Sequence, residues 1–263
     1  MISLKTKQSF CALLLSMWAT PAFASFHIVI DPGHGGVDKG AVYNSIREAE
    51  LVLTVAQKLQ TLLSKDPNFL VTMTREKDRA ISLPERVKTA EKANADLYVS
   101  LHANAALDQR ARGVEFFFQN NMPSDEDSLF LANQESQAIM NARDLHTISG
   151  GDELSKKGDI AAIVEDLRRQ NRMFSSLRLT KALTTIWEND ENAMQATIKQ
   201  APFYVISKTS MPAVLIEIGF ISNPREAKRL QQKDYQKDLA EKIYNALVSY
   251  KEKMDNSSAK NLN

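Results

Sequence analysis

Phe26-His27-Ile28-Val29-Ile30-Asp31-Pro32-Gly33-His34 carries the clearest indication of fold class in this chain. Its apolar residues favour a β-strand, and the proline and glycine that follow would end that strand just before an imidazole. A near-continuous apolar run is typical of a strand buried on both faces of a parallel sheet. The sequence therefore predicts a buried strand with a chemically active side chain at its carboxyl end.

The same alternation of strands and helices continues along the chain. Further strands are expected at residues 70–74, 97–101, 114–118, 203–206 and 213–217. Helices are expected at residues 51–63, 82–94, 129–142, 173–188 and 234–253. This order predicts a single α/β domain whose central, twisted, mostly parallel (mixed) sheet is flanked by helices.

The first 24 residues resemble an export signal. Lys5 and Lys7 precede an apolar run from Phe10 to Trp18, and Ala22-Phe23-Ala24 has the small-x-small pattern of a cleavage site. That run is short for a permanent membrane span, although an uncleaved anchor is the alternative. We expect a signal peptide at 1–24, one folded domain at 25–254 containing an insertion at 144–172, and a disordered tail at 255–263.

The composition is that of an ordinary globular protein. Of 263 residues 43% are hydrophobic and 25% charged, and the net charge is +1, which excludes collagen-like, disordered and polytopic membrane classes. We find no concentrated basic face, so no nucleic-acid partner and no stable membrane insertion are expected. Cleavage after Ala24 would leave 239 residues with 31 basic and 32 acidic side chains. It would also remove Cys11, the single cysteine, and with it any thiol mechanism.

Four side chains with catalytic potential stand beside the predicted strands and the first helix. His34, His102 and Glu217 follow or end apolar strands, and Glu48 precedes the first helix. Ligands and catalytic groups gather beyond the carboxyl ends of parallel strands. Two imidazoles and a carboxylate form a usual catalytic zinc set, and a second carboxylate can act as general base, although non-haem iron uses a similar set.

The two histidines also have a structural interpretation. His34 could be a turn residue in a glycine-rich loop, and His102 a buried core histidine. Glu217 is harder to explain in this way, because a carboxylate ending an apolar run is costly to bury without a partner. The glycines around His34 do not match the GxGxxG register, because Asp38 occupies the last glycine position. His27 and His146 are expected to be structural or solvated.

Four separated motifs resemble those of zinc-dependent N-acetylmuramoyl-L-alanine amidases of the Amidase_3 family. They are Asp31-Pro32-Gly33-His34-Gly35-Gly36-Val37-Asp38-Lys39-Gly40-Ala41, Arg47-Glu48, Ser100-Leu101-His102-Ala103-Asn104 and Glu217-Ile218-Gly219-Phe220-Ile221-Ser222-Asn223. The resemblance spans about residues 26–252. It implies that His34, Glu48 and His102 hold one Zn²⁺ per chain and that Glu217 is the catalytic carboxylate, with Glu50 as the alternative to Glu48.

The insertion at 144–172 resembles one in cell-division amidases, where a helix covers the zinc cleft until an activator with a LytM domain displaces it. The matching part here runs from Asp159 to Arg172. By this resemblance Glu165 is the candidate autoinhibitory ligand, followed by Asp159 and Asp166. The alternative is an ordinary surface helix that packs an apolar stripe on the core.

The resemblance implies an enzyme that hydrolyses the amide between N-acetylmuramic acid and L-alanine in peptidoglycan, during wall turnover and daughter-cell separation. With a cleavable signal peptide, its expected compartment is the periplasm. Two alternatives remain open: a zinc peptidase that acts elsewhere in the stem peptide, and a non-catalytic peptidoglycan-binding protein.

Overall fold

The computed structural model describes residues 25–120, 122–137 and 159–260. The predicted signal peptide and residues 144–158 of the predicted insertion lie outside this part. The elements follow one another as β1 (Phe26–Pro32), β2 (Val42–Tyr43), β3 (Ile46–Arg47), α1 (Glu48–Leu63), β4 (Phe69–Met73), α2 (Leu83–Ala93), β5 (Leu97–Asn104), β6 (Val114–Phe118), α3 (Glu126–Gln137), α5 (Asp159–Glu188), β7 (Ala196–Gln200), α6 (Tyr204–Ser207), β8 (Ala213–Phe220), α7 (Pro224–Leu230) and α8 (Lys233–Lys260).

A six-stranded mixed sheet forms the centre of the molecule, in the order β4-β1-β5-β8-β6-β7. Strands β4, β1, β5 and β8 are parallel, whereas β6 runs antiparallel to β8 and β7 runs parallel to β6. The carboxyl ends of β1, β5 and β8 therefore share one edge with the amino end of β6. This arrangement confirms the predicted α/β domain with a mostly parallel, mixed sheet.

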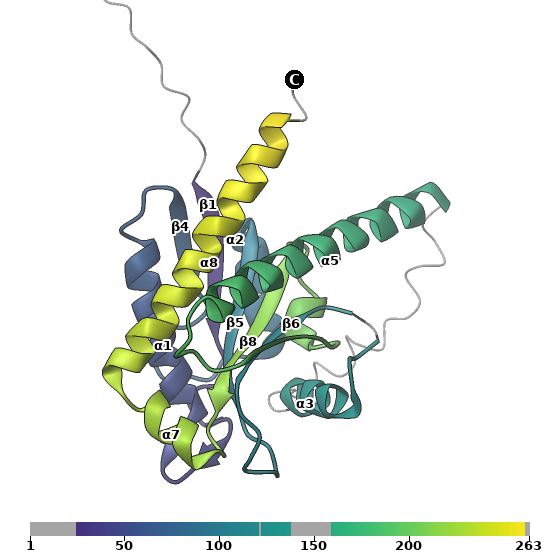
Figure 1. Cartoon of the computed structure of the whole chain (residues 1–263). Coiled ribbons are helices and arrows are strands. Elements are labelled where there is room, and N and C mark those ends of the chain that lie inside the picture. The colour runs from purple at the N-terminus through teal and green to yellow at the C-terminus, as the bar shows by residue number, and fades with distance from the viewer. Residues whose placement is uncertain (1–24, 121, 138–158, 261–263) are drawn as a thin grey trace, which may run out of the picture.

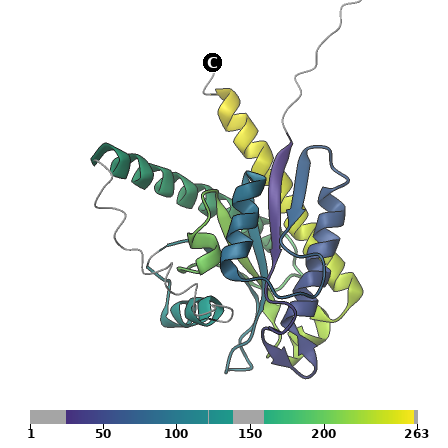
Figure 2. The same ribbon diagram turned by 180° about the vertical axis from the view of Figure 1, so that it is seen from behind.

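Helices cover both faces of the sheet. On one face α1, α8 and the C-terminal part of α5 pack on the strands, and on the other α2 and α6 do so (Figures 1 and 2). The side chains of β1 alternate accordingly: Ile28 and Ile30 join the core under α1 and α8, and Val29 joins the core under α2 and α6. The sheet is thus buried on both sides, as its apolar sequence predicts.

Residues 203–206 differ from the prediction, which was a strand. The structure has a short helix there, α6, and places the edge strand earlier as β7. Val205 and Ile206 have high strand propensity, but as a helical turn they pack into the core beneath α2 and α3. Tertiary packing overrides local propensity at this point. Strand β7 is only half-buried and carries little apolar alternation, so its sequence gave no strand signal.

Helices α5 and α8 are longer than predicted. The stripe expected within the insertion and the helix expected at 173–188 belong to one continuous helix of 30 residues, α5. Its N-terminal half projects from the body of the molecule and leaves Ile163, Val164 and Leu167 exposed (Figure 1). Helix α8 continues to Lys260, through most of the predicted tail. Within the described residues no helix has the length and apolar character needed to cross a bilayer.

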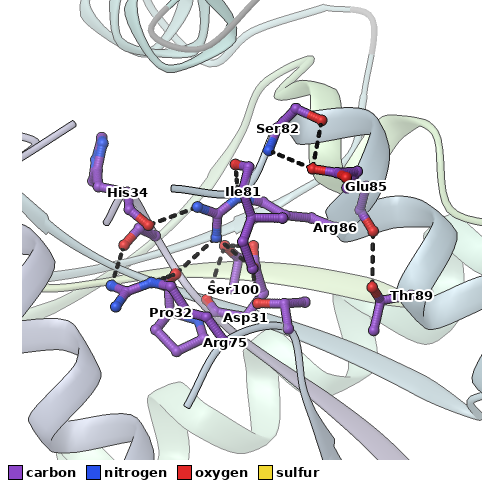
Figure 3. A network of polar contacts seen from close by, with 12 residues as sticks. Asp31, Pro32, His34, Arg75, Ile81, Ser82, Glu85, Arg86, Thr89 and Ser100 are labelled. Carbon is purple, nitrogen blue, oxygen red and sulfur yellow. Dashed lines mark hydrogen bonds and ion pairs between the residues drawn. The ribbon is translucent and has the colours of Figure 1, made fainter. Parts of the chain in front are cut away.

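A buried polar network fixes the end of β1 (Figure 3). Arg86 donates a hydrogen bond of 2.6 Å to Asp31 and further ones of 2.7 Å each to the carbonyl oxygens of Pro32 and His34. Burial alone would raise the pKa of Asp31, but the charge of Arg86 and the hydrogen bonds that Asp31 accepts from Thr74, Tyr98 and Arg86 together lower it. Arg75 donates to the carbonyl oxygens of Pro32 and Gly33 at 2.9 and 2.6 Å. The chain is therefore held by charged donors where the strand pairing ends.

We expect Arg86→Met to lower the free energy of unfolding by about 3–5 kcal/mol, because it leaves the buried Asp31 carboxylate unpaired. Arg169→Met is the matched control, since the Arg169–Asp166 pair has the same 2.6 Å separation as the Arg86–Asp31 pair but lies on the surface. The control should cost about 0–1 kcal/mol. Urea denaturation followed by circular dichroism measures both, and equal losses would contradict this interpretation of the network.

Candidate metal centre and active site

Two imidazoles and two carboxylates converge at the shared edge of the sheet. His34 follows β1, Glu48 begins α1, His102 lies in β5 and Glu135 lies in α3. His34 Nε2 is 3.1 Å from Glu48 Oε2 and 3.2 Å from Glu135 Oε2. His102 Nδ1 is 3.0 Å from Glu48 Oε1 and 3.5 Å from Glu135 Oε2. One donor atom from each of the four residues lies within 4.8 Å of all the others.

These separations suit a tetrahedral zinc ion. Ligand bonds of about 2.0–2.1 Å place neighbouring donor atoms of a tetrahedron about 3.3 Å apart. The four imidazole–carboxylate separations, from 3.0 to 3.5 Å, lie near this value, with His34 and His102 facing different oxygens of Glu48, and one donor atom per residue stays within 4.8 Å of the others. In addition, His34 Nε2 is buried yet has no hydrogen-bond partner among the described residues. A buried imidazole nitrogen without a hydrogen-bond partner is unusual. Coordination of a metal ion through its lone pair would give this nitrogen a partner.

Contacts around the cluster fix the orientation of each ligand. Asp38 Oδ2 lies 2.8 Å from His34 Nδ1, so Nε2 is turned toward the cluster. The two Glu48 oxygens accept hydrogen bonds from the backbone nitrogens of Ala41 and Ala103, at 2.9 and 3.0 Å. Gly40 has a φ of 62°, and a Cβ there would collide with Glu48 and His34. The loop after β1 thus leaves room for the two ligands.

Burial and charge oppose each other in setting the pKa values of these ligands. Burial alone would lower the pKa of His34, but the charge of Glu48 and the hydrogen bond to Asp38 raise it well above its usual range. Burial would raise the pKa of Glu48, but the imidazoles of His34 and His102 hold it well below its usual range. The cluster therefore keeps a carboxylate ionised inside the protein and favours a positive charge beside it.

Glu217 is a third carboxylate at the site, after Glu48 and Glu135. It lies in β8, with its Cα paired to that of His102 in β5, and only 1% of its surface is exposed. Burial, followed by the charges of Glu48 and Glu135, raises the pKa of Glu217 well above its usual range. Its Oε2 has no hydrogen-bond partner within the described part of the chain. A cavity of about 260 Å³ joins Glu217 to the ligands.

The comparison with known protein families agrees with this geometry. The Amidase_3 family of N-acetylmuramoyl-L-alanine amidases matches residues 28–249. The chain belongs to the Amidase_3 family. Among relatives, the amidase AmiC of Escherichia coli O6:H1 is 34% identical over 226 residues, which are 85% of this chain and 52% of AmiC. The amidase AmiA of Escherichia coli K12 is 29% identical over 234 residues, which are 88% of this chain and 78% of AmiA.

A third relative, the probable amidase AmiB of Haemophilus influenzae, is 31% identical over 253 residues, 94% of this chain and 57% of AmiB. The chain thus spans about half the length of AmiC and of this AmiB. Among solved structures, the catalytic domain of the amidase CwlV from Bacillus (Paenibacillus) polymyxa superposes with a TM-score of 0.62 at 25% identity, covering 86% of this chain and 98% of that one. An amidase from Clostridium difficile 630 gives 0.60 at 26% identity, covering 87% and 97%.

Within this Amidase_3 domain the structure brings together all four residues predicted for the reaction, His34, Glu48, His102 and Glu217. It does not bring Glu165 there. That side chain lies on an exposed part of α5, 3.3 Å from Arg172. Besides Glu48, a further carboxylate reaches both imidazoles: Glu135, which the sequence did not single out.

No feature of the sequence around Glu135 distinguishes it from a surface glutamate. Helix α3 carries several acidic residues, and only its position in three dimensions singles out this one. The remaining candidates lie elsewhere. Glu50 is half exposed and pairs with Arg47, Asp166 pairs with Arg169, and His27 contacts Thr72. His146 lies outside the described residues.

We expect His34→Ala and Glu48→Gln to weaken zinc binding by about a hundredfold, because the first removes a nitrogen ligand and the second removes the negative charge of a ligand. Glu50→Gln is the matched control, since it changes a carboxylate two residues from Glu48 that faces solvent. Zinc content after dialysis against a weak chelator, measured by mass spectrometry, checks the prediction. Zinc retained by Glu48→Gln and lost by Glu50→Gln would reverse the assignment.

Proposed function

We propose that this Amidase_3 chain is a zinc-dependent hydrolase of the amide that joins N-acetylmuramic acid to L-alanine in peptidoglycan. The observation that carries the proposal is the convergence of two imidazoles and a carboxylate beside the buried Glu217 Oε2, which has no hydrogen-bond partner among the residues that the structure describes. Family membership supplies the substrate class. The proposed compartment is the periplasm, reached by a signal peptide at 1–24, and the proposed role is wall turnover and daughter-cell separation.

In the proposed mechanism His34, Glu48 and His102 hold the zinc ion. When bound there, zinc supplies a Lewis acid that activates a water molecule and polarises the amide carbonyl. Glu217 accepts the proton of the attacking water and delivers it to the departing amine. The position of Glu217 suits this double role, because its Cα is paired with that of the ligand His102 and one cavity joins it to His34 and Glu48. Asp38 keeps the His34 ring in its ligating orientation.

Two other functions fit parts of the same site. A zinc peptidase acting elsewhere in the stem peptide would use the same ligands, and a non-catalytic protein would only bind the wall. Products separate the three. An amidase releases stem peptides that begin with L-alanine and leaves glycan without peptide, a peptidase shortens the stem peptide, and a binding protein releases nothing. Digestion of purified sacculi followed by mass analysis distinguishes these outcomes.

We expect Glu217→Gln to keep zinc and to lose activity on sacculi by about a hundredfold to ten-thousandfold, the usual contribution of general acid–base catalysis. Glutamine preserves the shape of the side chain but accepts no proton at neutral pH. The control is Glu241→Gln, at an exposed carboxylate paired with Lys237 on α8. Release of soluble products per zinc-loaded chain is the measurement. Full activity of Glu217→Gln would remove Glu217 from the mechanism.

We also propose that the site is autoinhibited. Glu135 Oε2 lies 3.2 Å from His34 Nε2 and 3.5 Å from His102 Nδ1, within reach of the coordination position that a catalytic water needs. A carboxylate bound there would stop the reaction. An activator, of the LytM type by resemblance, would relieve the block, and the exposed apolar stripe of Ile163, Val164 and Leu167 on α5 is the proposed contact for it.

Autoinhibition predicts a contrast between two glutamates. Glu135→Gln should raise basal activity about tenfold, because loss of the ligand charge shifts the equilibrium from the blocked to the open site, and about 1.4 kcal/mol corresponds to a tenfold change. Glu165→Gln should leave basal activity unchanged if Glu135 is the blocking ligand, since Glu165 lies exposed beside Arg172. Dye release from labelled sacculi, without any activator, measures both. Activation by Glu165→Gln alone would return the blocking role to Glu165.

A further inference from the structure

A series of polar contacts crosses the sheet beside Glu217. In the strand order, β8 with Glu217 lies between β5 with Asn104 and β6 with Glu115. Glu115 is paired directly with Glu217, so the two side chains project from the same face of the sheet. Asn104 Nδ2 donates a hydrogen bond of 3.0 Å to Glu115 Oε2, which places the Asn104 side chain on that face as well. The contacts therefore lie on the side of the sheet that carries the reaction centre.

Lys199 of β7 holds Glu115 from the other side. Its Nζ lies 2.9 Å from Glu115 Oε1 and 3.4 Å from Asp125 Oδ2. Burial alone would lower the pKa of Lys199, but the hydrogen bond and the charge of Glu115 raise it, so the lysine stays protonated. Each oxygen of Glu115 thus has its own partner, a lysine on one and an amide on the other.

This ion pair determines which way the Asn104 carboxamide faces. An ionised carboxylate only accepts hydrogen bonds, so the NH₂ group of Asn104 must point at Glu115 and Oδ1 must lie on the opposite side of the carboxamide. Asn104 is buried and lines the 260 Å³ cavity together with Glu217. Among the residues that the structure describes, none donates a hydrogen bond to Oδ1. Asn104 therefore offers this cavity an acceptor whose orientation is fixed from behind.

An acceptor in this place suits the nitrogen of the amide that is cleaved. In the proposed reaction water attacks the carbonyl carbon, Glu217 passes the proton of the water to the nitrogen, and the C–N bond breaks to leave a carboxyl group and an amine. The nitrogen carries positive charge once it receives this proton. Hydrogen bonds from charged donors are shorter and stronger than those from neutral ones. An acceptor beside Glu217 would therefore stabilise the departing amine more than the intact substrate.

We propose that Asn104 is a further catalytic residue, whose Oδ1 accepts a hydrogen bond from the N–H of the amide that is cleaved. Glu115 is a positioning residue, which acts by holding the Asn104 carboxamide in this orientation. Both roles rest on the proposed function. They add to the reaction a contact that recognises an amide by its N–H and that remains with the nitrogen as it departs.

A substrate without the N–H tests the role of Asn104. The amide substrate is N-acetylmuramoyl-L-alanyl-γ-D-glutamyl-L-lysine, and its ester analogue has L-lactate in place of L-alanine, so that an oxygen replaces the N–H. Both are given to the zinc-loaded chain and to Asn104→Ala. Asn120→Ala is the matched control, because its carboxamide donates to Gln200 at 3.1 Å and does not line the cavity. Zinc content and the thermal midpoint are measured for every variant.

We expect Asn104→Ala to lower kcat for the amide by about tenfold to a hundredfold, the usual effect of losing a hydrogen bond to a charged group. Its kcat for the ester should change little, because the ester offers Asn104 no donor. Asn120→Ala should leave both rates nearly unchanged. Equal losses on the amide and the ester would overturn the proposal, because a merely structural role affects both substrates alike.

Glu115→Gln tests the positioning role. A glutamine side chain both donates and accepts, so it no longer determines which way the Asn104 carboxamide faces. The change also removes a charge near Glu217, but that affects both substrates, so the ratio of amide to ester rates isolates the effect on Asn104. We expect Glu115→Gln to lower this ratio when Asn104 is present and to leave it unchanged in Asn104→Ala. The same change in both backgrounds, or none in either, would remove Glu115 from this role.

A binding measurement separates this proposal from the proposed function. Calorimetry with zinc-loaded Glu217→Gln gives the affinities of the amide and the ester without requiring turnover. We expect the amide to bind about twofold to tenfold more tightly, the range for a neutral hydrogen bond, and the double variant with Asn104→Ala to lose that preference. Equal affinities in Glu217→Gln would count against the contact. A wild-type chain that cleaves neither compound nor sacculi would refute the proposed function, and the affinities would still show whether Asn104 contacts the N–H.

Discussion

The ion pair between Asp31 and Arg86, with Arg75 beside it, is the interaction on which the site depends. These three groups are almost completely buried, and they lie where β1 leaves the sheet. The carbonyl oxygens of the next three residues accept hydrogen bonds from the two arginines at the point where β1 ends. Burial and the nearby Arg86 charge lower the pKa of Arg75 to about 10, which still leaves it charged at neutral pH.

These hydrogen bonds from Arg75 and Arg86 explain how a metal ligand can lie on a loop and yet have a fixed position. His34 adopts a φ of 56°, a conformation that non-glycine residues rarely adopt. Its carbonyl oxygen is held by Arg86, and its Nδ1 lies against Asp38, so both the backbone and the ring are fixed. Strain of this kind persists only where surrounding contacts outweigh it. The buried charges in the fold thus serve the geometry of the site.

The sequence predicts much of this arrangement because polar, ionisable side chains stand at the ends of apolar strands. His34, His102 and Glu217 are recognisable from their position after such strands, and Glu48 from its place at the start of a helix. The contribution of Glu135 could not be found in this way, because it depends on where α3 packs and not on any local pattern. Residues 203–206 were misassigned for a related reason: the core beneath α2 and α3 accepts Val205 and Ile206 from a helical turn as well as from a strand.

Although the net charge of the chain is only +1, acidic and basic side chains are separated along one edge of the sheet. Around the metal ligands the buried groups are acidic: Glu48 and Glu217 lie there, with Glu115 paired to Asn104 and Lys199 behind them. Before the amino end of β6, the preceding loop carries the exposed Arg110 and Arg112. Antiparallel β6 makes this possible, since it begins at the edge where β1, β5 and β8 end and so brings its preceding loop beside the site.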